Sequence, residues 1–108
     1  MLNPLKIPEM LSQASQIKEE MQRQLSQTVV EGTSGGGAVT ATMNGKKQLL
    51  KLHIDPSAVL GLTSGKPDVE MLEDLVMAAV NEAGRKAEEA LQASVKDLLG
   101  GLNLPGLG

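Results

Sequence analysis

Residues that commonly carry catalysis or metal binding are scarce in this 108-residue chain. It has one histidine, His53, and no cysteine, so the common histidine-based catalytic and zinc sites cannot form within one chain. Glu70, Glu73 and Asp74 stand close together, but they fall in the predicted first turns of a helix, where the helix dipole favours acidic side chains. We therefore expect no enzyme activity, no catalytic residue and no bound metal.

Three consecutive glycines, Gly35 to Gly37, could suggest a phosphate-binding loop. Such a loop follows a strand, carries a lysine beside a serine or threonine, and opens a helix. Here the glycines lie between two predicted strands, and no lysine adjoins them. A hairpin turn is the better interpretation, and we expect no cofactor and no small-molecule substrate.

Basic residues form the set whose chemistry points to a ligand. The set follows the predicted elements: Lys18 and Arg23 off the apolar stripe of the first helix, Lys46 and Lys47 beside the hairpin tip, Lys51 on the outer face of the sheet, and Arg85, Lys86 and Lys96 along the last helix. Each alone is best explained as a solubilising charge, but the set, doubled in a dimer, could line a concave surface facing a duplex. The chain has no Phe, Tyr or Trp on which bases could stack. Binding would therefore rest on phosphate contacts to double-stranded DNA.

The charge of the chain is unevenly distributed. Ten basic and thirteen acidic residues give a net charge of -3. Residues 1–54 hold six bases and four acids, whereas residues 55–108 hold four bases and nine acids. An acidic total weakens attraction to phosphate, but it does not forbid a local basic surface.

Length and composition limit the architecture. They predict one domain over residues 1–99, followed by a disordered Gly/Leu tail over residues 100–108. No run of about 18 apolar residues is present, so no membrane span is expected. The N-terminal residues lack a secretory pattern, and we expect a cytoplasmic protein.

Apolar spacing predicts two helices. The stripe of the first helix recurs every three or four residues and predicts a helix over residues 8–27: Met10, Ala14, Ile17, Met21 and Leu25. The same spacing from Leu72 to Leu98 predicts a second helix of about 32 residues, with Asp68 at its start and Gly84 as its weak point.

The intervening residues predict a three-stranded antiparallel meander, with strands over 28–34, 38–43 and 48–54. Asn44 and Gly45 predict a type I′ hairpin, which requires positive φ at both positions. Alternation in the third strand places three apolar residues on one face and two polar residues on the other: Leu50, Leu52 and Ile54 against Lys51 and His53.

The predicted fold class is α+β, in the order helix, three-stranded antiparallel meander, long C-terminal helix (α-β-β-β-α). Residues 57–66 would connect the sheet to the last helix, with a helical turn at residues 57–60. The last helix would overhang so small a sheet and carry an alanine-rich stripe beyond it. A homodimer would cover this stripe, and the alternative is an elongated monomer with an exposed apolar seam.

Three segments, in this order, resemble the YbaB/EbfC family of bacterial nucleoid-associated proteins. Residues 35–46 (GGGAVTATMNGK) resemble the glycine-opened central hairpin of that family, and residues 52–56 (LHIDP) resemble its closing strand. Residues 72–83 (LEDLVMAAVNEA) resemble the opening of its last helix, with Asn81 among alanines as the most specific feature. The resemblance covers about residues 8–99.

The resemblance implies a tweezer-like homodimer in which the sheets join the subunits and the helices project as arms. It also implies DNA binding that alters DNA conformation, in nucleoid organisation and gene regulation, and hence a place in the nucleoid. Lys18, Arg23, Arg85 and Lys86 are the DNA-contact candidates, chosen by charge and position on the arms.

A second function fits the same residues. The acidic last helix and the many alanines and methionines suit helix-in-groove contacts. The alternative is therefore a dimeric structural adaptor that recruits a protein partner in recombination or replication housekeeping.

Overall fold

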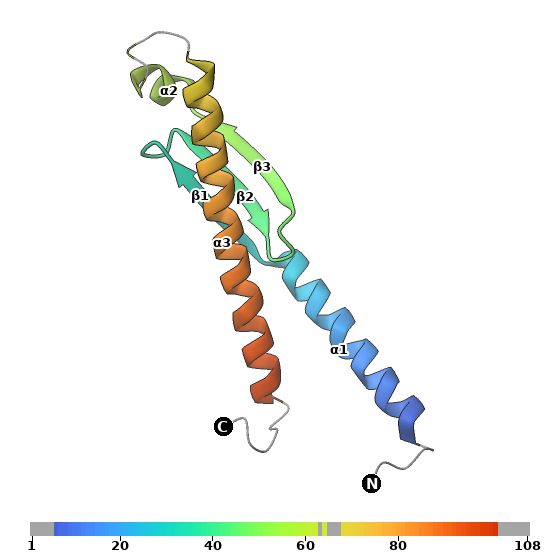
Figure 1. The fold of residues 1–108 in the computed structure, drawn as a ribbon. Helices are drawn as coiled ribbons and strands as arrows, with labels where there is room; N and C mark the ends of the chain where they lie inside the picture. The colour runs from blue at the N-terminus through green and yellow to red at the C-terminus, as the bar shows by residue number, and fades with distance from the viewer. Residues whose placement is uncertain (1–5, 63, 65–67, 102–108) are drawn as a thin grey trace.

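The computed structural model describes residues 6–62, 64 and 68–101. Figure 1 shows two long helices attached to one small sheet. The elements in chain order are α1 (Ile7–Gln27), β1 (Val29–Ser34), β2 (Val39–Asn44), β3 (Leu49–Ile54), α2 (Pro56–Leu62) and α3 (Val69–Gly101). The strands pair antiparallel in the order β1-β2-β3. The α+β prediction and its element order are confirmed, and the predicted helical turn after the sheet is the short helix α2.

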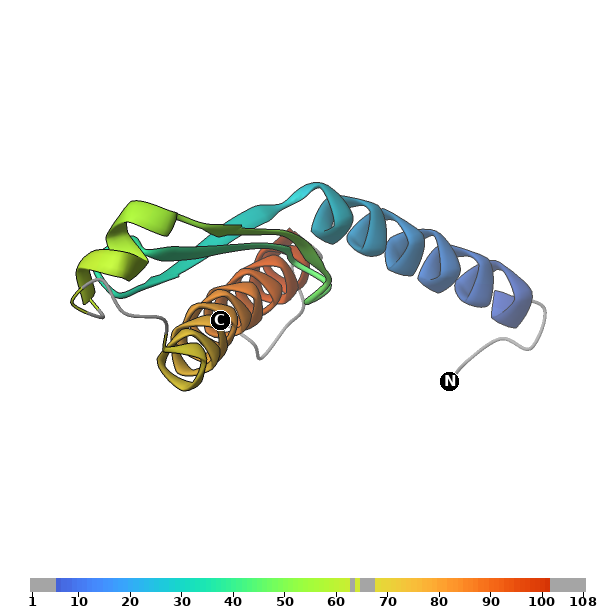
Figure 2. The same cartoon turned by 90° about the horizontal axis from the view of Figure 1, so that it is seen from above.

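The sheet and α3 form two layers, with α3 on one face of the sheet (Figure 2). α3 packs mainly across β1 and β2. The buried residues of this contact are small or unbranched, and they come from β2 and α3: Val39, Ala41, Met43, Ala79, Ala83 and Ala87. The core is therefore thin, and β3 lies to one side of it.

Gly32 of β1 makes the closest approach between the two layers. A Cβ atom at this position would lie 2.3 Å from Ala79 O and 2.3 Å from Ala83 N. No side chain of any size fits there, because α3 lays its own backbone on the strand. Ala79 and Ala83 are fully buried and allow this approach because each carries only a methyl group.

The pairing of β3 confirms the predicted faces of Leu52, Ile54, Lys51 and His53. Ile54 pairs with Val39 and Leu52 with Ala41 on the core face, while His53 pairs with Thr40 on the other face. The register shifts next to the Thr42–Lys51 pair, where β3 accommodates an extra residue, Leu50. Since α3 packs mainly on β1 and β2, most of the apolar face of this strand stays exposed: Leu49 is 47% exposed, Leu50 53% and Leu52 39%.

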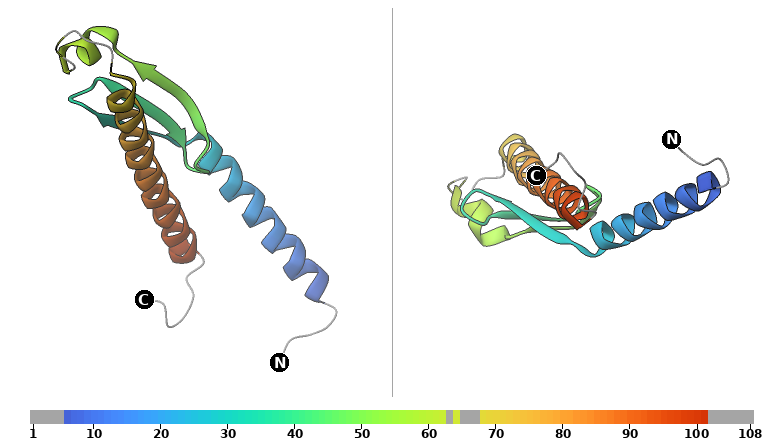
Figure 3. Two further views of the ribbon diagram at one scale, coloured as in Figure 1. Left: turned by 45° about the horizontal axis from the view of Figure 1, so that its top comes forward. Right: turned by 90° about the horizontal axis from the view of Figure 1, so that it is seen from below.

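α1 and the C-terminal half of α3 project past the sheet in the same direction and separate as they leave it (Figures 1 and 3). The Cα radius of gyration is 20.5 Å, and the molecule measures 70 × 26 × 18 Å. A compact chain of this length would have a radius of gyration of about 13 Å. We call α1 and the C-terminal half of α3 the two arms.

Aspartate side chains cap the N-terminal ends of α2 and α3. Asp55 Oδ1 accepts hydrogen bonds from the backbone N–H groups of Ser57 (3.0 Å) and Ala58 (3.3 Å), and Asp68 Oδ1 accepts one from Met71 (3.0 Å). At its other end α3 continues through Gly100 and Gly101, two residues beyond the predicted boundary at residue 99, a difference that is usual at helix ends. The rest of the predicted tail, residues 102–108, lies outside the described residues.

Two glycines should respond to alanine in opposite directions. Gly32→Ala forces the sheet and α3 apart and should lower the free energy of unfolding by about 2 kcal/mol or more. Gly84→Ala, in the middle of α3, adds a methyl group that meets nothing within 4 Å, and it should raise the free energy by about 1 kcal/mol. Urea unfolding at one protein concentration measures both. Equal effects of the two substitutions would contradict the packing described here.

Candidate nucleic-acid interface

Three of the four predicted DNA-contact residues are paired with acidic residues on their own helices. Arg23 pairs with Glu20 on α1, and on α3 Arg85 Nη1 lies 2.6 Å from Glu89 Oε1 and Lys86 Nζ lies 3.3 Å from Glu82 Oε1. Lys18 has no such ion pair among the described residues. The three pairs are solvent-exposed and are three or four residues apart in sequence, and pairs of that kind are weak. Their cations can therefore exchange a carboxylate for a phosphate at little cost.

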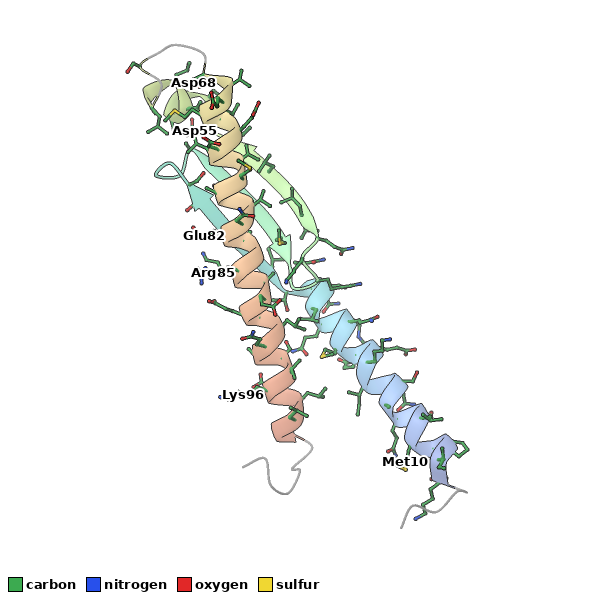
Figure 4. All side chains as sticks on the ribbon, in the orientation of Figure 1. Met10, Asp55, Asp68, Glu82, Arg85 and Lys96 are labelled. Carbon is green, nitrogen blue, oxygen red and sulfur yellow. The ribbon has the colours of Figure 1, made fainter. Side chains whose placement is uncertain are left out.

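The structure does not bring the four residues together on one surface. Lys18 and Arg23 are five residues apart on α1, which places them about 140° apart around the helix axis. On α3, Arg85 lies on the side away from α1, and Lys96 lies on the same side, eleven residues or about three turns further along (Figure 4). Lys96 was not among the predicted contacts, although its spacing from Arg85 would have identified a shared face.

Net charge differs sharply between the elements. α1 carries three acids and two bases, and α3 carries seven acids and three bases. The sheet with its hairpins, residues 28–54, carries three lysines and a single acid, Glu31. The sheet with its hairpins thus carries a net positive charge. The arms do not, because α1 has a net charge of -1 and the C-terminal half of α3, residues 85–101, has three bases and three acids.

The hairpin between β2 and β3 differs from the predicted type I′ turn. Its positive φ is at Lys47 (64°), not at Asn44 or Gly45, so that prediction is wrong. Asn44 is 3% exposed, and its side chain organises a longer loop: Oδ1 accepts hydrogen bonds from the backbone N–H groups of Lys46 and Gln48, both at 3.0 Å. Nδ2 of Asn44 donates to Gln48 Oε1 at 2.7 Å. The hydrogen bonds of the buried Asn44 amide therefore stabilise this longer loop in place of a two-residue turn.

The same hairpin anchors both arms. The Gly45 N–H donates to Leu25 O (2.8 Å) and to Thr28 O (3.0 Å), which holds the C-terminal end of α1. A Cβ atom at Gly45 would lie 2.9 Å from Leu25 Cδ2 and 3.0 Å from Leu25 O, so a larger residue would displace α1. Two residues further on, Lys47 Nζ lies 2.6 Å from Glu88 Oε2 of α3.

The Lys47–Glu88 ion pair is, within the described part of the chain, the one pair that joins two different elements. The hydrogen bond from Lys47 and its positive charge hold the pKa of Glu88 below its ordinary value of 4.5. Both side chains remain about half exposed. The pair links the base of the α1 arm to the middle of α3.

The structure also places three other sequence features that could carry chemistry: the glycine run, His53 and the acidic cluster at residues 70–74. Gly35, Gly36 and Gly37 have φ angles of 61°, 68° and 99° and form the turn between β1 and β2, as predicted. His53 lies exposed on the polar face of the sheet. The carboxylates at residues 70–74 are exposed in the first turns of α3. Within the described residues, no group of three His, Cys, Asp or Glu side chains is arranged to hold a metal ion.

Comparison with known proteins gives the family. The model of the YbaB/EbfC DNA-binding family matches residues 3–102. The chain belongs to this family. A nucleoid-associated protein of Acidobacterium capsulatum is 64% identical over 104 residues, which is 96% of each chain. A nucleoid-associated protein of Koribacter versatilis is 52% identical and covers 91% of this chain and 92% of its own length.

The fold is also found in a solved structure. The crystal structure of an uncharacterised protein of Helicobacter pylori matches with a TM-score of 0.75 at 22% identity, covering 92% of this chain and 99% of that chain. At that identity the likeness concerns the fold. In the described part of this YbaB/EbfC-family chain, no helix is long and apolar enough to cross a membrane.

The ionic link between Lys47 and Glu88 predicts a pH-dependent stability. Because folding lowers the pKa of Glu88, the stabilisation is present above the ordinary value of 4.5 and is lost as the pH falls through the lowered value. Lys47→Gln should therefore lower the melting temperature near neutral pH, and the difference from wild type should disappear well below pH 4.5. Lys46→Gln removes a neighbouring lysine without an ion pair in the described structure and is the control. A Lys47→Gln difference that persists unchanged in acid would contradict the assignment.

Proposed function

We propose that this YbaB/EbfC-family protein binds double-stranded DNA as a homodimer, mainly through phosphate contacts, and alters the conformation of the DNA. Its roles would be nucleoid organisation and gene regulation, in the nucleoid of the cytoplasm. The observation that carries the proposal is the match of nearly the whole chain to a DNA-binding family. The names of relatives that are 64% and 52% identical support the nucleoid as the place of action.

A dimer is favoured by the apolar surface that the single chain leaves uncovered. The exposed leucines of β3 face the side of the sheet on which α3 lies, and Met77 of α3 is 56% exposed. Glu88 of α3 points to the β2–β3 hairpin. Met77 is eleven residues, or about three turns, before Glu88, so it lies on the same face of α3. We call Leu49, Leu50, Leu52 and Met77 the β3 patch. Exposed apolar side chains beside an exposed strand edge are typical of a subunit interface.

A dimer would double the arms and their cations. Lys18, Arg23, Arg85 and Lys86 are the proposed phosphate contacts on the arms, three of them after exchange of a carboxylate partner. With no aromatic residue in the chain, stacking on unpaired bases is not available, and affinity depends on charge. A protein that holds a duplex at several separated phosphates can impose its own shape on it.

A structural adaptor is the second candidate, favoured by a groove between the arms. The groove is lined by Gln13, Gln16, Ile17 and Glu20 of α1 and by Leu98 of α3. It offers amide, acidic and aliphatic groups and no base. A gel shift at near-physiological salt separates the candidates, because an adaptor would leave the duplex unshifted at tens of micromolar protein while retaining a protein partner.

Charge introduced into the β3 patch should separate the subunits. Leu52→Glu would bring a carboxylate into the proposed interface, and light scattering at micromolar concentration should then report a monomer in place of a dimer. Leu99→Glu is the matched control, because Leu99 is 40% exposed near the end of α3, outside the patch, against 39% for Leu52. A monomeric wild type, or a Leu52→Glu dimer as stable as the control, would overturn the proposed interface.

Charge reversal on α1 tests the arm contacts. Replacing Lys18 and Arg23 together by glutamate should weaken duplex binding roughly tenfold or more at near-physiological salt, because two attractive charges become repulsive. The dimer, measured by light scattering, should remain. Each single variant shows which side of α1 faces the DNA, since the two residues lie on different sides. Unchanged affinity of the double variant would reject both residues as contacts.

A further inference from the structure

We propose that the face of the sheet opposite α3 is a contact surface for the backbone of double-stranded DNA, in addition to the arms. This inference rests on the proposed function and assigns part of the binding to a different surface. We call the surface the outer face. Its polar side chains alternate away from the core or, for Lys46, lie in the hairpin beside them: Glu31, Thr33, Thr40, Thr42, Lys46, Lys51 and His53. Val29 is an exposed apolar residue on the same face.

The strand register places these side chains in rows across the sheet. Glu31 pairs with Thr42, and Thr42 pairs with Lys51, which makes one row across all three strands. Thr33 pairs with Thr40, and Thr40 pairs with His53, which makes the next row. Paired residues of an antiparallel sheet point to the same side. Both rows therefore lie opposite the core residues.

No helix of the described residues lies over the middle of this face, because α3 occupies the other side (Figure 2). Glu31, Thr33, Lys51 and His53 are exposed. Three strands about 4.8 Å apart, each of six residues at about 3.3 Å, give a surface near 10 Å wide and 20 Å long. That length spans about six base pairs of a duplex backbone.

The chemistry of the outer face suits phosphate oxygens. Lysine ammonium, threonine hydroxyl and imidazole groups are donors of the kind that contact DNA phosphates. Lys46 and Lys51 form no ion pair in the described part of the chain, whereas Arg23, Arg85 and Lys86 are each paired with an acid. The two lysines can therefore bind phosphate without first releasing a carboxylate.

Local charge favours this face over the arms. On this face Lys46 and Lys51 outnumber Glu31. In contrast, α1 carries three acids and two bases, and the C-terminal half of α3, residues 85–101, carries three of each. The lysines also gather at one end. Lys51 pairs with Thr42 next to the hairpin, and Lys46 lies in the hairpin. A duplex backbone would meet positive charge at this end of the sheet, where α1 is attached.

Glu31 is the exception and supplies the sharpest test. It lies in the same row as Lys51, with Thr42 between them. If phosphates approach this row, the Glu31 carboxylate repels them. Glu31→Gln should then tighten duplex binding by about two- to threefold, the effect of removing one like charge about 7 Å away in water. A gain of affinity cannot result from damage to the fold.

The experiment measures duplex affinity over a range of salt concentrations with full-length protein. Lys46→Gln and Lys51→Gln together should weaken binding and make the slope of log affinity against log salt shallower by up to about 2, one for each phosphate that the variant no longer neutralises. Lys47→Gln is the matched control, because Lys47 adjoins Lys46 in the hairpin but reaches Glu88 of α3, on the other side of the sheet. The control should change the slope by less than half the change of the double variant.

The outcomes separate this inference from the proposed function. A shallower slope for the sheet lysines together with tighter binding by Glu31→Gln supports the outer face. If wild type binds duplex but the sheet variants and Glu31→Gln match wild type, the outer face is overturned and the arms alone bind DNA. If wild type does not bind duplex at low salt, the proposed function itself fails.

Discussion

The direct contact between the backbone of β1 and the backbone of α3 determines the shape of this molecule. Gly32 leaves room for Ala79 and Ala83, and these fully buried alanines form the seam between helix and sheet. The buried core consists mostly of alanine and contains no aromatic ring, so close approach of backbones replaces large side chains at this contact. The helix is consequently committed to β1 and β2, and β3 keeps an uncovered apolar face.

The β2–β3 hairpin contacts both arms at the end of the sheet. Gly45 holds the end of α1 through two backbone hydrogen bonds, and Lys47 reaches Glu88 on α3. Both arms are thus fixed to one loop, and they extend beyond any core that could support them. Apolar side chains of the β3 patch and along both arms stay exposed in the single chain. We propose a second copy as the occupant of this surface.

Much of the fold could be predicted from the sequence, because its signals are local. The apolar stripes gave both long helices, and period-two alternation gave the strands and the faces of Lys51 and His53. The predicted type I′ turn is wrong because Asn44 organises the loop through its buried side chain, a tertiary effect that turn statistics do not contain. The extra residue in β3 likewise depends on how that loop closes.

The candidate interface was harder to predict than the fold. The sequence identifies lysines and arginines, but it does not show that Arg23, Arg85 and Lys86 are paired or that Lys18 and Arg23 lie on different sides of α1. It places Lys51 on the polar face of the sheet and Lys46 in the hairpin, but it does not show that the middle of this face is left uncovered by the helices of the described residues (Figure 2). The ion pairs and the positions of these side chains depend on strand register and on helix rotation, which become known only with the structure.

The central claim is that the dimer holds a duplex by its phosphates. The most direct measurement compares wild-type affinity for a duplex and for one of its single strands as salt is raised. The account predicts tighter binding to the duplex, with log affinity falling linearly against log salt at about 0.9 per phosphate contacted. Equal or tighter binding to the single strand, or duplex affinity that does not change with salt, would contradict it.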